Sequence, residues 1–200
     1  MIAIIDYGIG NLGSVKNALD YLKIDNVITS DKNIILNADK VILPGVGAFK
    51  EAIDTFRARG FEEVIKKVIE SNKPVLGICV GMQMLFEYSY EYGKHKGLGI
   101  MKGEIVKFDS HNKYKIPHMG WNQIEVVNDN PLLKDMNNSD VYFVHSYYLP
   151  YPNENAIAVT EYADVKYVSA VRKNNVYACQ FHPEKSGEVG LQILKNFGDL

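Results

Sequence analysis

The sequence predicts an α/β fold, with a mostly parallel central sheet flanked by helices and a β-rich second half. Short apolar runs alternate with amphipathic segments in the first half, which is typical of βαβ units. The second half carries β-branched and aromatic runs separated by turn residues. Two hundred residues, 46% of them hydrophobic, suffice for one buried core. We therefore expect a single domain over residues 1–200.

The first half is expected to contain short buried strands connected by helices. The strands are predicted at residues 1–6, 26–30, 40–44 and 74–78, and the helices at 10–23, 48–72 and 80–89. In the first helix Leu12, Val15, Leu19 and Leu22 form one apolar stripe. Gly60 interrupts the second helical segment, which predicts one broken helix or two short ones.

The second half is expected to consist of strands and one closing helix. The strands are predicted at residues 101–108, 121–127, 141–149, 155–162 and 168–181, with a hairpin tip at Asn174 and Asn175. The tyrosine-rich segment 87–97 is interpreted as a surface loop. Ser186 is the predicted N-cap of a helix that places Val189, Ile193, Leu194 and Phe197 on one face.

Composition excludes several classes of function. A net charge of −2 predicts no nucleic-acid binding, and no apolar run is long enough to span a bilayer. The opening "MIAIIDYGIGN" shows neither a basic leader nor a cleavage site, and the two cysteines do not form a disulfide framework. These features predict a cytoplasmic protein. The five histidines lack metal-ligand spacing, so no metal or cofactor is expected.

The segment "GICVG" has the spacing of a nucleophile elbow with Cys79 at its centre. Gly77 and Gly81 permit close backbone approach on both sides of a tight strand-to-helix turn. A helix N-terminus at this point favours a thiolate and can hold an oxyanion. The alternative is a small hydrophobic cysteine in an ordinary turn, and the motif by itself does not decide between them.

The segment "QFHPEKS" supplies a candidate base and an orienting acid. His182 and Glu184 are two residues apart, so in an extended segment both side chains project to the same side. Pro183 lacks an N–H and ends the strand ladder. Alternatively, His182 is a surface histidine and Glu184 merely favours the start of the last helix. Together with the elbow, the pair predicts a Cys-His-Glu triad.

A third segment, "LPGVGAF" at residues 43–49, places glycines directly after a predicted strand. Such a loop can expose backbone N–H groups toward a ligand, although a plain β-to-α turn is the simpler interpretation. The lysine and the serine or threonine of a phosphate-binding loop are absent from it.

These three segments resemble the signature segments of class I glutamine amidotransferases. "IDYGIGNLGSVKNAL", "IPHMGWN" and "YFVHSYY" are similar to one group within this family, the glutaminase subunits of imidazole glycerol phosphate synthases. The resemblance covers residues 2 to about 197. It implies a flavodoxin-like domain that hydrolyses L-glutamine to glutamate and ammonia.

The resemblance also implies a role for each matching residue. Cys79 would attack the carboxamide, His182 would move protons and Glu184 would orient the histidine. The remaining implied residues are Val80, Gly45, Val46 and Gly47 for the oxyanion, and Gln83, His145, Ser146 and Tyr147 for the substrate.

The partner implied by the resemblance is a (β/α)8-barrel cyclase subunit in a heterodimer. It would use the ammonia to convert PRFAR into imidazole glycerol phosphate and AICAR in histidine biosynthesis. Asn11, Trp121, Tyr142 and Lys185 would face this partner. The alternatives are that Trp121 belongs to the core, Tyr142 is an ordinary strand residue and Lys185 is a solvated charge.

Three other functions compete with this interpretation. A glutaminase subunit for anthranilate, pyridoxal phosphate or purine synthesis would lack the "YGIGN" and "PHMGWN" segments. A flavodoxin-like stress protein of the DJ-1 type explains the elbow but not "HPE" near the C-terminus. A non-catalytic binding subunit leaves the complete triad unexplained. Cys179 has no assigned role and is expected in the core.

Overall fold

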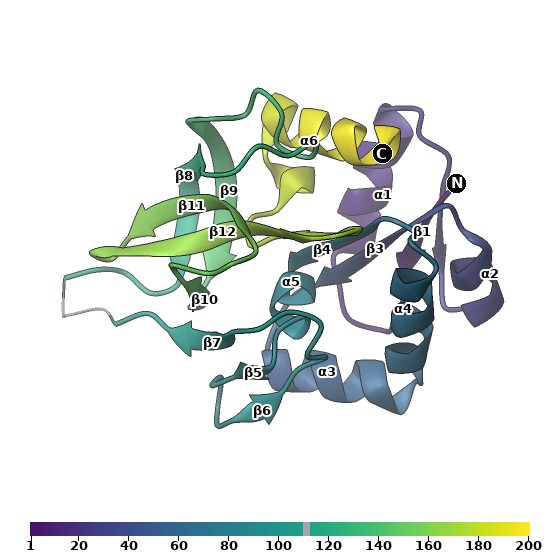
Figure 1. The fold of residues 1–200 in the computed structure, drawn as a ribbon, viewed down its shortest axis with the longest axis horizontal. Coiled ribbons are helices and arrows are strands. Elements are labelled where there is room, and N and C mark those ends of the chain that lie inside the picture. Colours follow the sequence, from purple (N-terminus) through teal and green to yellow (C-terminus); the bar gives the residue numbers. More distant parts are fainter. Residues whose placement is uncertain (110–112) are drawn as a thin grey trace.

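The computed structural model describes residues 1–109 and 113–200, and Figure 1 shows its layers. The helices are α1 (Leu12–Tyr21), α2 (Lys32–Asn37), α3 (Phe49–Ala58), α4 (Phe61–Glu70), α5 (Val80–Met84), the 3₁₀ helix η1 (Pro183–Lys185) and α6 (Gly187–Asp199). The strands are β1 (Ile2–Ile5), β2 (Asn26–Thr29), β3 (Lys40–Gly45), β4 (Val75–Cys79), β5 (Tyr88–Ser89), β6 (His95–Lys96), β7 (Glu104–Lys107), β8 (His118–Val126), β9 (Ser139–His145), β10 (Tyr147–Pro150), β11 (Ala156–Tyr162), β12 (Val165–Lys173) and β13 (Val176–Cys179).

The centre of the sheet is parallel, as predicted. The strands lie in the order β2-β1-β3-β4-β13, and each neighbouring pair is parallel. Every residue of β4 and β13 is buried, because helices cover both faces of this part of the sheet. In Figure 1, α1 and α6 lie on one side of these strands and α3, α4 and α5 on the other.

The β-rich half continues the same sheet with antiparallel strands. β12 pairs with β13, β10 and β11, and β8 connects β11 to β9. The predicted segment 168–181 forms β12 and β13 around Asn174, whose φ of +54° confirms the hairpin tip. The predicted segment 141–149 divides at Ser146 into β9 and β10. The parallel half and the β-rich half therefore share one sheet.

Two predicted elements differ from those observed. Helix α5 ends at Met84 instead of extending to residue 89. The carbonyls of Met84, Leu85 and Phe86 accept hydrogen bonds from the backbone of residues 98–101, so a distant segment replaces the next helical turn. Segment 87–97, predicted as a loop, contains the short strands β5 and β6. Helix α2 was not predicted; Asp31 caps it by accepting from two backbone N–H groups.

The break at Gly60 is confirmed, and it separates α3 from α4 as two helices. Gly60 has a φ of +73°, a conformation that glycine adopts without a steric penalty. Phe56 and Phe61 on either side of the turn are both buried, and their ring centroids lie 5.6 Å apart. The turn therefore folds both helices onto the same core.

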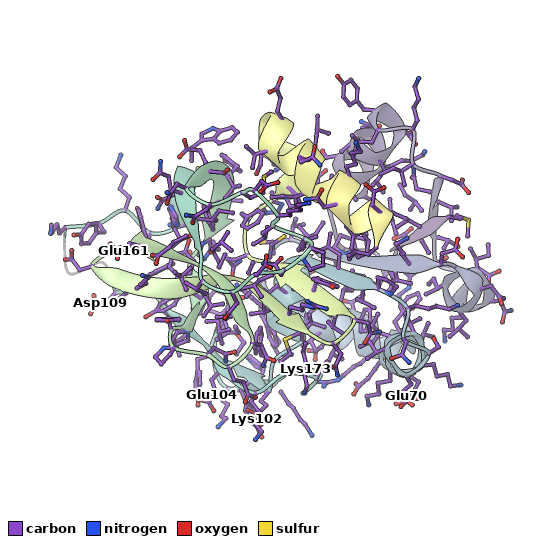
Figure 2. The ribbon with its side chains drawn as sticks, turned by 45° about the horizontal axis from the view of Figure 1, so that its top comes forward. Glu70, Lys102, Glu104, Asp109, Glu161 and Lys173 are labelled. Carbon is purple, nitrogen blue, oxygen red and sulfur yellow. The ribbon has the colours of Figure 1, made fainter. Side chains whose placement is uncertain are left out.

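A single apolar core extends through the parallel half and the β-rich half. It includes Ile4 of β1, Phe143 of β9 and Phe197 of α6, all with no exposed surface. Figure 2 labels charged side chains outside this core; Glu70, Lys102, Asp109, Glu161 and Lys173 are exposed and Glu104 is half-buried. Within residues 1–109 and 113–200, no helix has the length and apolar character needed to cross a membrane.

Candidate active site

The candidate site lies where adjacent parallel strands end. β4 ends at Cys79, and its neighbour β3 ends at Gly45 in direct register with it. β13, on the other side of β4, leads within three residues to His182. Because the carboxyl ends of parallel strands meet at one edge of a sheet, all three predicted segments converge there.

Cys79 occupies a strained turn between β4 and α5. Its φ of +54° and ψ of −110° lie in a region that side chains rarely adopt, and it precedes the first residue of α5. A Cβ atom at Gly81 would lie 2.0 Å from the carbonyl oxygen of Leu43, and one at Gly45 would lie 2.6 Å from the Gly81 nitrogen. The predicted close backbone approach is therefore confirmed.

Gly81→Ala is expected to lower the free energy of unfolding by about 3 kcal/mol, because the backbone of β3 would have to move. Urea titration measures the change. Gly13→Ala is the matched control: a Cβ there meets nothing within 4 Å, and φ is not in the left-handed region. This control should be neutral or stabilise the protein by up to about 1 kcal/mol. Equal stability of the two variants would contradict the close approach.

His182 and Glu184 form a buried pair. His182 Nδ1 lies 2.7 Å from Glu184 Oε1, and the two side chains are 2% and 1% exposed. The alternative of a surface histidine is therefore wrong. The predicted extended segment is also wrong, because Pro183 begins the 3₁₀ helix η1. The turn is closed by a hydrogen bond of 3.0 Å from the Lys185 N–H to the His182 carbonyl, and it brings Glu184 back onto the imidazole.

Ser186 has a different role from the predicted cap. It precedes α6, but its hydroxyl makes no capping hydrogen bond to that helix. Instead it donates to the His182 carbonyl at 2.6 Å and accepts from the Tyr142 N–H at 3.0 Å. Ser186 therefore ties the backbone of His182 to β9.

The pKa of His182 reflects two opposed effects. Burial disfavours the imidazolium, but the interactions with Cys79 and Glu184 outweigh it and raise the pKa of His182 to about 10. Nδ1 faces the carboxylate, and Nε2 is buried with no hydrogen-bond partner among the described residues, on the side of the cavity that Cys79 also lines. The imidazole can therefore exchange a proton with the Cys79 sulfur, and its charged form favours a thiolate.

A cavity of about 280 Å³ opens beside the sulfur. Its lining residues are Val46, Gly47, Cys79, Val80, Gln83, Glu91, Val144, His145, Ser146, Tyr147, His182 and Lys185. Most of the predicted catalytic, oxyanion and substrate residues are thus together. Gly45 and Glu184 are not among the lining residues. Gly45 packs against the start of α5, and Glu184 contacts His182. No group of three or more possible metal ligands occurs among the described residues.

Of the four predicted partner residues, Lys185 lines the cavity and the other three do not. Trp121 is 57% exposed, so the alternative that it belongs to the core is wrong. It pairs across β8 and β9 with Tyr142, and the two ring centroids lie 6.1 Å apart. Lys185 is exposed, and Asn11 is half-buried just before α1. Cys179, expected in the core, is fully buried there.

Two polar residues at the site, and the lining residue Val144, were not predicted from the sequence. Glu91 is the only acidic residue among those that line the cavity, and it accepts from the Phe49 N–H at 2.5 Å. It lies in the segment predicted to be a loop, where no pattern distinguished it. Gln180 is fully buried, with Nε2 3.6 Å from Cys79 Sγ. Its position two residues before His182 was an available signal, since alternate strand residues share a face.

Comparison with known proteins is consistent with this geometry. The model of the family "Glutamine amidotransferase class-I" matches residues 3–199. The imidazole glycerol phosphate synthase subunit HisH of Caldanaerobacter subterraneus subsp. tengcongensis is 54% identical over 203 residues, which cover 100% of this chain and 98% of that protein. The subunit of the same name from Bacillus cereus is 51% identical over 198 residues, covering 98% and 93%.

A solved structure shows the same fold at lower identity. The structure of PurLQS from Thermotoga maritima has a TM-score of 0.73 at 20% identity, covering 98% of this chain and 96% of that one. This structural similarity confirms the predicted fold class. The family is shown by the relatives that share about half of their residues with this chain. The chain belongs to the class I glutamine amidotransferases and, within them, to the HisH subunits of imidazole glycerol phosphate synthase.

Proposed function

We propose that this chain hydrolyses glutamine with Cys79 as nucleophile, His182 as general base and acid, and Glu184 as the orienting carboxylate. The observation that carries the proposal is the buried 2.7 Å contact between His182 Nδ1 and Glu184 Oε1, which leaves Nε2 for the thiol. A base held by an acid beside a nucleophile on a strained turn is the arrangement that acyl transfer requires.

The reaction would proceed through a thioester. The Cys79 thiolate adds to the carboxamide carbon, and His182 then gives a proton to the departing ammonia. Water, deprotonated by His182, releases glutamate in the second half of the reaction. The Val80 N–H at the start of α5, with the backbone of Gly45, Val46 and Gly47, would hold the oxyanion. Gly47 has a φ of +79°, so the orientation of this loop depends on a glycine.

The other lining residues would hold the substrate. Gln83, Ser146 and Tyr147 line the cavity. Glu91 has the charge required by the α-ammonium group of glutamine. His145 also lines the cavity, but both of its ring nitrogens face groups of the protein, so we assign it an indirect role.

The ammonia would serve a second subunit. The curated relatives are named as a subunit of imidazole glycerol phosphate synthase. We propose a (β/α)8-barrel cyclase as the partner of this chain, making imidazole glycerol phosphate and AICAR from PRFAR in the cytoplasm. The exposed pair of Trp121 and Tyr142, with Lys185 and Asn11, would form the docking surface. An exposed tryptophan is typical of such surfaces.

Partner binding is expected to raise glutaminase activity. One oxyanion donor is worth a factor on the order of a hundred in rate, so a single reoriented peptide in the Gly45–Gly47 loop would be a sufficient switch. The measurement compares the isolated chain, its complex with the cyclase, and the complex loaded with the cyclase's nucleotide substrate. We expect activity to rise at least about a hundredfold from the first state to the third. Equal activity in all three would instead indicate a stand-alone cysteine hydrolase.

A further inference from the structure

A continuous chain of hydrogen bonds crosses the β-rich half and ends on the nucleophile. Its members belong to β8, β12, β9, β10, α5, the segment after β13 and the end of β4. In spatial order they are Asn122, His118, Tyr167, His145, Tyr147, Gln83, Gln180 and Cys79. Except for Asn122 at its far end, all of them are buried. Each link has a direction, because each hydrogen bond needs one donor and one acceptor.

The carbonyl of Tyr147 fixes which group donates and which accepts in every hydrogen bond of this series, because a carbonyl oxygen can only accept. His145 Nδ1 lies 2.8 Å from it and Gln83 Nε2 lies 3.1 Å from it. His145 must therefore carry its proton on Nδ1. Gln83 must present its amide nitrogen, and not its oxygen, to this carbonyl.

The links beyond His145 follow from this choice. Burial lowers the pKa of His145 to about 3, so its ring is neutral and Nε2 is an acceptor. The Tyr167 hydroxyl, 3.3 Å away, donates to it. The same oxygen accepts from His118 Nδ1 at 3.2 Å; burial lowers the pKa of His118 to about 4, so that ring is neutral as well.

The far end of the chain is anchored independently. Asn122 Oδ1 accepts from the backbone N–H of Gln123 at 2.8 Å, so its Nδ2 is the donor facing His118 Nε2 at 3.4 Å. The direction required by Tyr147 and the direction required by Asn122 agree. Both histidine tautomers are therefore assigned from two separate ends.

The links toward the sulfur follow in the same way. The second N–H of Gln83 donates to Gln180 Oε1 at 3.0 Å. The other end of the Gln180 amide, Nε2, then faces Cys79 Sγ at 3.6 Å. A reversed Gln180 amide would bring two NH₂ groups together and leave an oxygen against the sulfur. Gln180 therefore presents an N–H to the nucleophile.

We propose that Gln180 is a further catalytic residue of the proposed glutaminase reaction, one that stabilises the Cys79 thiolate by donating an N–H to it. His145, Tyr167 and His118 are positioning residues that keep the Gln83 and Gln180 amides in the required orientation. This inference rests on Cys79 being the nucleophile. A hydrogen bond to the charged form of a group stabilises that form, so loss of the donor makes the thiolate harder to form.

Several other titratable groups surround the sulfur. His182 comes from the segment after β13, Tyr7 from the loop after β1 and Cys179 from β13. Lys185 and Glu91 line the same cavity. The effect of Gln180 therefore has to be measured with all of these groups left intact.

The test is the pH profile of alkylation of Cys79 by iodoacetamide, followed by mass spectrometry of its peptide. Gln180→Met has a similar size but no donor, and its alkylation midpoint is expected about one pH unit above that of the unaltered chain. Gln192→Met, on the exposed face of α6, is the matched control and should leave the midpoint in place. An unshifted midpoint in folded Gln180→Met would overturn the proposal.

Variants of residues distant from the sulfur test the series of hydrogen bonds that leads to Gln180. Tyr167→Phe removes one oxygen and should shift the midpoint in the same direction by a smaller amount. His145→Leu should do likewise, whereas His145→Asn, whose amide nitrogen can stand in for Nδ1, should restore the midpoint. Midpoints that stay unchanged in folded Tyr167→Phe and His145→Leu would show that these residues do not position Gln180. The alkylation midpoint is measured without turnover of glutamine. An unshifted midpoint would therefore contradict the role of Gln180 alone, whereas the proposed glutaminase function is tested separately by the turnover of Cys79→Ser.

Discussion

Cys79→Ser is expected to abolish glutamine hydrolysis while the protein stays folded. Serine is nearly isosteric with cysteine and can keep the contact with Gln180. An alkoxide is far harder to generate than a thiolate, so we expect a loss on the order of 10⁵-fold or more in turnover. The measurement is glutamate release by the complex with the cyclase, compared with the unaltered chain at equal concentration.

The control for this variant uses added ammonium salts. Free ammonia bypasses the glutaminase, so formation of the cyclase product should persist with ammonium and vanish with glutamine. Thermal unfolding of Cys79→Ser should match the unaltered chain. Near-normal glutamine turnover by the folded variant would remove Cys79 from the mechanism and with it the proposed function.

His182→Ala and Glu184→Gln are expected to differ in severity. Removing the base should cost on the order of 10⁶-fold in turnover, because neither the thiol nor the leaving group then has a proton carrier. Replacing only the orienting acid should cost about 10⁴-fold, since the imidazole is still present. Single-turnover measurement of acyl-enzyme formation in the complex separates the two.

Folding must be compared in the same experiment. His182→Ala leaves the buried Glu184 carboxylate without its partner and is expected to lower the free energy of unfolding by about 3 kcal/mol. Turnover is therefore compared per folded molecule, with the folded fraction taken from urea titration. If Glu184→Gln were the harsher variant per folded molecule, the roles of base and orienting acid would have to be exchanged.

Local sequence patterns were sufficient for the elements with strong periodicity. The strands β1, β3 and β4 are short, mostly apolar and mostly buried runs, and α4 has a regular apolar face, so their type follows from side-chain spacing. Side-chain spacing did not predict where α5 ends. Its last carbonyls are taken by residues 98–101, and a contact between segments more than ten residues apart leaves no periodic signal.

The candidate site was also predicted only in part: the residues of its proposed triad followed from the sequence, but their geometry did not. Cys79, His182 and Glu184 were predicted because the glycine spacing and the "HPE" segment encode an elbow and a base-acid pair locally. Their mutual geometry was predicted incorrectly: a 3₁₀ turn, and not an extended strand, brings Glu184 onto His182. The exposure of Trp121 was implied by the family resemblance but not by its strand pattern, since an alternating pattern does not say which face is covered.

By itself, the sequence determined the fold class, the order of most elements and the residue types at the proposed nucleophile, because these depend on spacing within short segments. Tertiary structure decided which polar groups meet. Gln83 and Gln180 are 97 positions apart, and His118 and Tyr167 are 49 apart, yet each pair shares a hydrogen bond. The physical reason is that parallel and antiparallel strands from distant segments pair side by side. The direction of the hydrogen bonds that reach the Cys79 sulfur therefore exists only in the assembled sheet.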